Sequence, residues 1–235
     1  MRSPHPPRLS GGGATVVRLV VPPRPTREGP QDPPGAEPAA PPRSAAATDE
    51  QLVEACKAGE RWAAAELLTR FAPLVERLLR RVLGHDRELE DLAQEALATV
   101  LTSIHQVRDP AALRGWVAQI AVHTAHRAIR KRRLHRWLLF WAPRPELELP
   151  PDVGARETLG RVYAVLGELP AEQRVPFALR FIEEMPLEEV AQACGTSLAT
   201  IKRRLSRAEK RFLALARRDP VLAARIEEGG RWASD

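Results

Sequence analysis

Residues 185–218 read MPLEEVAQACGTSLATIKRRLSRAEKRFLALARR, and this stretch decides the fold class. Pro186 suits the first position of a helix, because its missing N–H would have no partner there. Gly195 can adopt the left-handed conformation that ends a helix, and Thr196 and Ser197 can each cap the next one. The pattern predicts two short helices joined by a tight turn, which is typical of a helix-turn-helix that binds duplex DNA.

The second helix of this pair is strongly basic. Leu198, Ile201 and Leu205 form its expected buried stripe. Its cationic side chains lie largely on the other faces, where a major groove and the flanking phosphates would meet them. These side chains are Lys202, Arg203, Arg204 and Arg207. The alternative is an ordinary pair of amphipathic helices whose basic face is solvated.

The charge of the whole chain supports a polyanionic partner. The 235 residues carry a formal net charge of +6. The positive charge gathers in two clusters, at residues 127–136 and 202–218. Two separate clusters can hold nucleic acid at two places, although either cluster alone is also compatible with a solvated face.

Cysteine and histidine usage argues against several classes of site. Cys56 and Cys194 are the only cysteines and both lie in helical patterns, which disfavours a disulfide framework or structural zinc and fits a reducing cytoplasm. His123 and His126 lie one helical turn apart without a Cys or carboxylate partner, so we expect no metal and no cofactor. No phosphate loop or nucleophile motif points to an enzyme, and no run is long and apolar enough for membrane insertion.

Proline divides the chain into segments. Residues 1–47 hold more than half of the 22 prolines and few large apolar residues, so we expect a disordered tail. Helical periodicity then defines a first domain at 48–136 and a second at 156–218. Between them, residues 137–155 lose the pattern at four prolines and are expected to form a flexible linker. Residues 219–235 form a C-terminal tail that opens with a short helix.

The fold class expected is all-α, with two small helical domains joined by a flexible linker and a helix-turn-helix in the C-terminal one. No strand alternation occurs in the sequence. Trp137, Phe140 and Trp141 are unusual in a linker, and they either dock on the first domain or contact a partner.

The first domain is expected to begin at a capping box formed by Thr48 and Gln51. Trp62, Ala65 and Leu68 then recur at helical spacing, which predicts that they share an inward face. The arginines expected to give this pair of helices a basic outer surface are Arg70, Arg77, Arg80 and Arg81.

Residues 88–104 carry the strongest helical periodicity in the chain, with an apolar stripe at three–four spacing. Asp91, Gln94 and Glu95 lie off that stripe and form a polar, acidic outer face. Asp109 and Pro110 then open a further helix, as cap and first-turn residue, and this helix runs into the first basic cluster.

Three segments in this order resemble the small bacterial RNA polymerase sigma factors of the extracytoplasmic-function group, within the sigma-70 family. ELEDLAQEALATVL at 88–101 resembles the family's region 2 helix. ALRGWVAQIAVHTAHRAIRKRR at 112–133 resembles the stretch that follows it. ELPAEQRVPFALRFIEEMPLEEVAQACGTSLATIKRRLSRAEKRF at 168–212 resembles region 4, with its L-P-x-x-x-R run and helix-turn-helix. The resemblance covers roughly residues 48–218.

This resemblance implies roles for the polar faces of the first domain. Asp91, Gln94 and Glu95 would bind core RNA polymerase. The helix from Pro110 would meet the −10 promoter element, where the family opens the DNA and holds an extruded base. The residues expected to contact this element are Arg114, Trp116, His123, Arg127, Arg130, Lys131, Arg132 and Arg133. His123 stands where the family frequently has Asn, which leaves the preferred base open.

The second domain would then read the −35 element as duplex DNA. The residues expected to contact it are Thr196, Ser197, Thr200, Lys202, Arg203, Arg204 and Arg207. The function implied is that of a non-enzymatic factor that binds core polymerase, directs initiation at specific promoters and is often held inactive by an anti-sigma factor between its two domains. The alternative is a free-standing helix-turn-helix regulator that does not bind polymerase.

Overall fold

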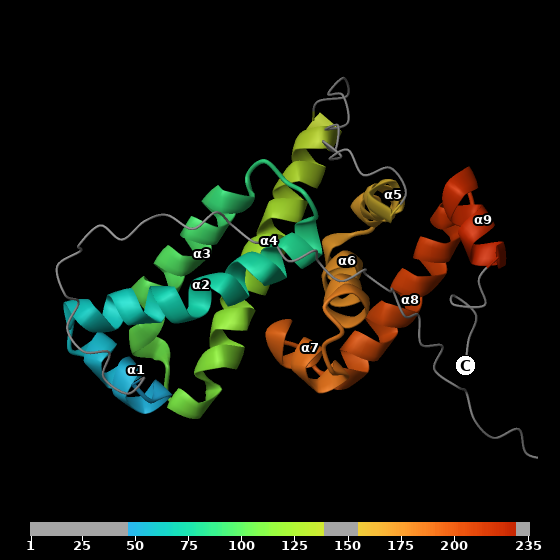
Figure 1. Ribbon diagram of the computed structural model, residues 1–235. Coiled ribbons are helices and arrows are strands. Elements are labelled where there is room, and N and C mark those ends of the chain that lie inside the picture. Colours follow the sequence, from blue (N-terminus) through green and yellow to red (C-terminus); the bar gives the residue numbers. More distant parts are fainter. Residues whose placement is uncertain (1–46, 139–154, 229–235) are drawn as a thin grey trace, which may run out of the picture.

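The computed structural model describes residues 47–138 and 155–228, and every regular element in these ranges is a helix (Figure 1). The predicted all-α fold is therefore confirmed. Most of the expected tail and linker, including Phe140 and Trp141, lies outside the described residues, as does the side chain of Trp137. None of the described helices is both long enough and apolar enough to cross a bilayer.

The first domain is a bundle in which three long helices pack against one another in pairs. Its elements are α1 (Asp49–Lys57), α2 (Arg61–Leu83), α3 (Leu89–Ser103), the 3₁₀ turns η1 (Ile104–Gln106) and η2 (Pro110–Ala112), and α4 (Leu113–Leu138). Asp109 caps η2 by accepting a hydrogen bond from the N–H of Ala111, so proline and aspartate start this segment as predicted, but as a 3₁₀ turn that leads into α4. The helix α4 continues to Leu138, two residues into the expected linker.

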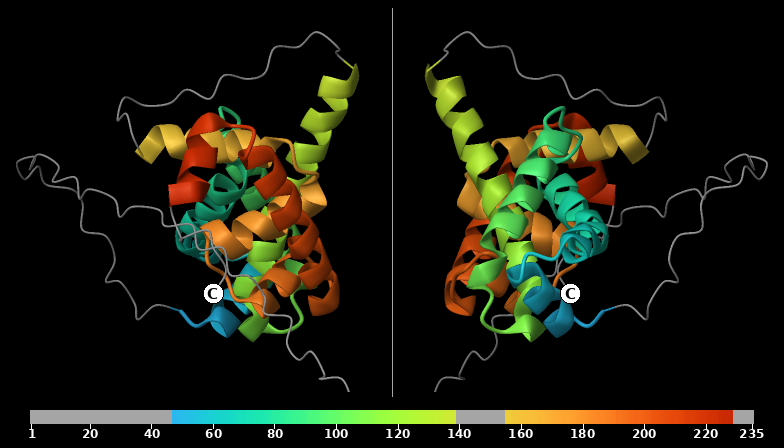
Figure 2. Two further views of the ribbon diagram at one scale, coloured as in Figure 1. Left: turned by 90° about the vertical axis from the view of Figure 1, so that its right-hand side faces the viewer. Right: turned by 90° about the vertical axis from the view of Figure 1, so that its left-hand side faces the viewer.

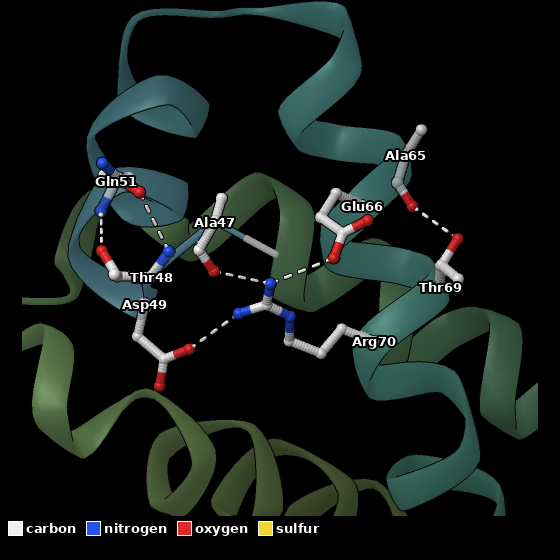
Figure 3. A network of polar contacts seen from close by, with 8 residues as sticks. All are labelled: Ala47, Thr48, Asp49, Gln51, Ala65, Glu66, Thr69 and Arg70. Carbon is white, nitrogen blue, oxygen red and sulfur yellow. Dashed lines mark hydrogen bonds and ion pairs between the residues drawn. The ribbon is translucent and has the colours of Figure 1, made fainter. Parts of the chain in front are cut away.

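A polar network fixes the start of the first domain (Figure 3). The capping box predicted at Thr48 and Gln51 is present. The Arg70 guanidinium, on α2, contacts Asp49 Oδ1 at 3.0 Å, the carbonyl oxygen of Ala47 at 2.7 Å and a Glu66 oxygen at 3.0 Å. The prediction that Arg70 belongs to a basic outer surface is wrong, because two carboxylates neutralise it while it ties α1 to α2.

The inward face of α2 differs from the one predicted. Trp62 is 50% exposed and Ala65 is also exposed, so the predicted inward set is wrong for both. The true apolar stripe starts one residue later and keeps strict three–four spacing over five turns. It contains Ala63, Leu67, Phe71, Leu74, Val75, Leu78 and Val82.

The second domain holds the predicted helix-turn-helix. Its elements are α5 (Ala155–Gly167), α6 (Ala171–Phe177), the π-helical turn η3 (Ala178–Ile182), α7 (Leu187–Ala193), α8 (Leu198–Ala216) and α9 (Pro220–Glu228). Pro186 is the N-cap of α7, so the helix begins one residue later than predicted. Gly195 has φ of +58°, as expected for the turn, and Ser197 rather than Thr196 is the N-cap of α8.

Three aromatic rings pack together and join α8 of the helix-turn-helix to α6 and η3. The Phe177 ring, at the end of α6, lies 4.9 Å from the Phe212 ring on α8 and 4.7 Å from the Phe181 ring, measured between centroids. All three rings are buried. Ile201 and Leu205 are buried as predicted, so the axis of α8 is fixed with its polar face outward.

The two domains pack against each other (Figures 1 and 2). The helix α4 contacts α6 and α7, and η3 contacts α2. In the views of Figure 2 the coloured helices of both domains form one compact body, from which the end of α4 projects.

Candidate nucleic-acid interface

The exposed face of α8 presents cations for which the described part of the chain supplies no acidic partner, and three of them are among the residues expected to contact DNA. Lys202, Arg203 and Arg207 are exposed. Arg203 donates a hydrogen bond to Thr200 Oγ1 at 3.3 Å, which orients its guanidinium along the first turn of the helix. Arg204 is only partly exposed and lies toward the first domain, beside a groove described below.

The start of α8 is organised around Ser197. Its Oγ accepts a hydrogen bond from the Thr200 N–H at 3.3 Å and lies 2.9 Å from Thr200 Oγ1. Its hydroxyl is therefore engaged in capping the helix. Other N–H groups of a first helical turn have no intrahelical acceptor, so a phosphate is a suitable ligand at this end. Thr196 is partly buried in the turn.

The residues of α4 that are expected to contact DNA fall into two groups, exposed and partly buried. Those that are exposed are Arg114, His123, Arg127, Arg130, Lys131 and Arg133. Trp116 is partly buried and packs against the hydrophobic core, so one part of its ring supports the fold. Arg132 is also partly buried, with 33% of its side chain exposed.

Arg132 is bound within its own domain. Its guanidinium forms ion pairs with Asp86, including a contact of 2.9 Å to Oδ1, and with Glu88 Oε2 at 2.7 Å. Burial lowers the pKa of Arg132, but hydrogen bonds and charges from Glu88 and Asp86 outweigh that effect and raise it. The same contact lowers the pKa of Glu88. Arg132 thus holds the loop between α2 and α3 against α4.

The acidic face of α3 lies next to the basic face of α4. Asp91, Gln94 and Glu95 are exposed, while Ala93 and Ala96 of the same helix are buried, as the periodicity predicts. Glu95 forms an ion pair with Arg127 of α4. The residues expected to bind polymerase and those expected to bind DNA therefore share one edge of the domain.

A groove between the two domains brings together residues of α4, expected to contact the −10 element, and Arg204 of α8, expected to contact the −35 element. Its volume is about 610 Å³. It is lined by His126, Ile129, Arg130, Arg133, Leu134, Ala171, Glu172 and Arg204. Burial and the charge of Arg130 lower the pKa of His126. Nothing in the helical periodicity predicted this juxtaposition, because it depends on how the domains pack.

Sequence reasoning also missed the residues that join the domains. Arg77 and Arg81 of α2 form ion pairs with Glu183, which directly follows η3. The spacing of these two arginines, one helical turn apart, was the signal that a single carboxylate could meet both. No group of three His, Cys, Asp or Glu side chains suited to a metal occurs among the described residues.

Two family models match the chain. The model "Sigma-70 region 2" matches residues 67–135, and "Sigma-70, region 4" matches residues 159–212. The first match runs from residue 67, within α2, through most of α4, and the second runs from residue 159, within α5, through most of α8. Each match therefore contains one of the two helices that carry the candidate cations.

Curated relatives agree with these matches. The chain is 31% identical over 124 residues to the RNA polymerase sigma factor SigV of Bacillus subtilis, covering 51% of this chain and 70% of the relative. It is 30% identical over 144 residues to the ECF RNA polymerase sigma factor RpoE of Cereibacter sphaeroides, covering 60% and 79%. It is 27% identical over 169 residues to the ECF sigma factor SigM of Mycobacterium tuberculosis, covering 72% and 84%.

Two solved structures share the fold. One is CnrH in complex with the cytosolic domain of CnrY, with a TM-score of 0.51 at 23% identity, covering 73% of this chain and 98% of that one. The other is the sigma factor RpoE in complex with the anti-sigma factor NepR from Bartonella quintana, with a TM-score of 0.50 at 24% identity, covering 65% and 95%.

Proposed function

This chain belongs to the extracytoplasmic-function group of the sigma-70 family, and we propose which of its surfaces bind the polymerase and which bind the promoter. As a member of this group it binds core RNA polymerase and promoter DNA and directs promoter-specific transcription initiation. It is not an enzyme, since the polymerase carries out the reaction. The observation that carries the proposal is that each matched region contains a helix with an exposed basic face.

The outer face of α3 is the proposed polymerase contact. Asp91, Gln94 and Glu95 are exposed on it, and the apolar residues of the same helix face inward. Carboxylate and amide groups on such a face match a basic partner surface and steer its approach. The ion pair between Glu95 and Arg127 would be exchanged for contacts with the polymerase and the DNA.

The proposed −10 interface follows α4. Arg130, Lys131 and Arg133 are exposed and suit the phosphate backbone of the opened strand. His123 and the accessible part of Trp116 lie toward the start of the helix, where they suit contact with bases. Arg114 and Arg127 extend the same basic surface. We assign Arg132 a different role from the one the sequence predicted, because Asp86 and Glu88 already occupy its guanidinium.

The proposed −35 interface is the exposed face of α8. Lys202, Arg203 and Arg207 suit bases and phosphates of a major groove, and Thr200 orients Arg203. The free N–H groups at the start of the helix, beside Thr196 and Ser197, suit a phosphate. Arg204 would join this set only when the second domain moves away from α4.

Two measurements test this assignment of surfaces. Binding to purified core polymerase tests the α3 face, and run-off transcription from a promoter of the source genome tests the DNA-binding faces. We expect Asp91→Ala with Glu95→Ala to reduce polymerase binding, and Arg203→Ala with Arg207→Ala to reduce promoter use while polymerase binding stays intact. Glu90→Ala, an exposed acidic change on the same helix, is the matched control for α3. If the α3 variant bound polymerase as tightly as the unaltered protein, the contact face would be elsewhere.

We also infer that the protein acts in the cytoplasm and is held inactive there by an anti-sigma factor. The relative from Bartonella quintana forms a complex with the anti-sigma factor NepR. The groove between the domains, with its arginines and the 58% exposed Leu134, suits an acidic amphipathic segment of such an inhibitor. Copurification of the tagged protein from the source cell, with and without Leu134→Asp, tests this inference, and unchanged inhibitor capture by the variant contradicts it.

A further inference from the structure

We propose that the groove between α4 and α8 is a binding site for a small organic polyanion, a nucleoside polyphosphate. Three guanidinium groups would hold the phosphates, and an apolar wall beside them would hold the base. The site depends only on residues of this chain, so it does not rest on the polymerase and promoter contacts proposed above. A nucleotide and the acidic inhibitor segment would compete for this one groove.

Arg204 is the residue of this groove for which the described part of the chain supplies no partner. The other described arginines that are partly buried each have an acceptor within the protein. They are Arg70, Arg81, Arg132, Arg161, Arg174 and Arg180. Arg204 is partly buried as well, but it forms no hydrogen bond or ion pair with a described residue. Because a cation loses hydration when it is buried without a partner, this guanidinium suits an anion from outside the chain.

Two arginines of α4 line the groove together with Arg204. The lining residues of α4 recur at three–four spacing, so they form one stripe along the helix. They are His126, Ile129, Arg130, Arg133 and Leu134. Arg130 and Arg133 are exposed and form no ion pair with a described residue. Three guanidinium groups therefore lie around one groove, and a ligand with several negative charges relieves their mutual repulsion.

A chain of phosphate groups is the anion that best matches these side chains. A guanidinium is planar and remains charged, and it binds phosphate oxygens through two parallel N–H donors. Arg130, Arg133 and Arg204 come from two helices, so consecutive phosphate groups can each meet a different guanidinium. A single carboxylate, with its two oxygen atoms, forms only one such bidentate pair.

The rest of the groove suits the base of a nucleotide. Its volume of about 610 Å³ lies within the range of about 300–1,000 Å³ that is typical of small-molecule sites. Ile129 and Ala171 give it a buried apolar wall, and the exposed side chain of Leu134 extends that wall. Among the described residues, Leu134 and Trp62 are the exposed large apolar side chains. A planar base that packs on this wall would remove the Leu134 side chain from water.

Two further groups in the lining favour a nucleotide over a bare polyphosphate. The Glu172 carboxylate would repel phosphate, but it accepts hydrogen bonds from a ribose hydroxyl or from an amino group of a base. Burial and the charge of Arg130 lower the pKa of His126, although Glu172 acts in the opposite direction. The His126 imidazole is therefore uncharged at neutral pH, and its ring suits stacking on a base.

A nucleotide in this groove would compete with DNA for the same side chains. Arg130 and Arg133 belong to the proposed −10 interface, and this consequence alone rests on that proposal. Bound phosphates occupy both guanidinium groups, so the protein should bind a single-stranded −10 oligonucleotide less tightly when the nucleotide is present. Promoter binding would then depend on the concentration of the nucleotide.

Calorimetric titration of the full-length chain with GTP, ATP and inorganic triphosphate, at about 0.15 M salt, tests the site. We expect GTP or ATP to bind about tenfold more tightly than inorganic triphosphate, because the base adds contacts to the apolar wall. Arg204→Ala should weaken nucleotide binding about tenfold, since one charge-assisted contact is lost. Arg211→Ala, an exposed arginine of α8 outside the groove lining, is the matched control and should leave nucleotide binding unchanged.

A second variant guards against a merely misfolded protein. Arg204→Lys keeps the charge but not the planar fork, so it should recover part of the lost affinity. Absence of nucleotide binding, equal affinity for inorganic triphosphate and both nucleotides, or equal losses in Arg204→Ala and Arg211→Ala would each overturn the site. Nucleotide binding that leaves the affinity for the −10 oligonucleotide unchanged supports the site and instead refutes the proposed role of Arg130 and Arg133, so the two proposals fail separately.

Discussion

The basic helices α4 and α8 look alike in sequence but differ in how their cations are held. On α4, Arg127 pairs with Glu95, and Arg132 pairs with Asp86 and Glu88. On α8, the exposed cations Lys202, Arg203 and Arg207 have no acidic partner among the described residues. Two arginines of α4 therefore already have partners within the fold, whereas these three cations of α8 are available for a ligand.

This difference has a physical consequence for DNA binding. An arginine that is already paired must give up its carboxylate before it binds phosphate, so its net gain is small. An unpaired, exposed arginine releases counterions from DNA without that loss. We therefore expect α8 to bind duplex DNA with its full charge, and α4 to contribute mainly when the polymerase has already positioned the strand.

The largest effect expected is on stability, at Arg132. Arg132→Ala leaves the 15% exposed carboxylate of Asp86 without its cation and releases the loop before α3, so we expect the free energy of unfolding to fall by about 2 kcal/mol. Arg133→Ala, its exposed neighbour, should change this free energy by less than about 0.5 kcal/mol. Urea unfolding followed by circular dichroism measures both. Equal stability of the two variants would remove the distinction between the arginines of α4.

The next effect concerns the cap of the DNA-reading helix. Ser197→Ala removes the acceptor of the Thr200 N–H and should cost about 1 kcal/mol of stability in the second domain. Thr196→Ala, in the same turn, should cost less, because Thr196 is not the cap. Hydrogen exchange at the amides of the first turn of α8 checks this pair. Faster exchange in the Thr196 variant than in the Ser197 variant would reverse the assignment of the cap.

The helices and their caps could be predicted from the sequence because both depend on local chemistry. The box at Thr48, the turn at Gly195 and the buried pair Ile201 and Leu205 were all confirmed. The prediction of which face of α2 is buried was wrong. Alanine and tryptophan occur on both buried and exposed faces, so the packing partners decide which face they take. Trp62 illustrates this, being half exposed.

The partners of charged residues could not be predicted at all. Arg70 and Arg132 read as surface cations in the sequence, but each meets carboxylates from distant segments. Ion pairs of this kind depend on tertiary packing rather than on helical periodicity. For the same reason the groove that joins Arg130 to Arg204 was invisible in the sequence.

A smaller effect compares single arginines in DNA binding. Arg203→Ala should weaken binding of a −35 duplex by about fivefold and reduce the salt slope by about 0.9, because one phosphate contact is lost. Arg127→Ala should change the affinity for a single-stranded −10 oligonucleotide by less than about twofold, since Glu95 already holds its guanidinium. Fluorescence anisotropy at several salt concentrations measures both. A larger loss for Arg127→Ala would mean that its ion pair does not compete with DNA.

The smallest effect is a pH dependence that arises at the ion pair between Arg132 of α4 and Glu88. The hydrogen bond and charge of Arg132 lower the pKa of Glu88 below its ordinary value of 4.5, so this pair stabilises the folded state above that value and the stabilisation is lost as pH falls through the folded pKa. Because 64% of the Glu88 side chain is exposed, solvent screening should keep the contribution below about 0.5 kcal/mol. Unfolding free energies measured between pH 6 and about pH 3.5 should therefore fall slightly less in Glu88→Gln than in the unaltered protein. Arg203→Ala is the control on α8 and should follow the curve of the unaltered protein, since Arg203 forms no ion pair with a carboxylate among the described residues. A steeper fall in Glu88→Gln than in the unaltered protein would show that the pair does not stabilise the fold.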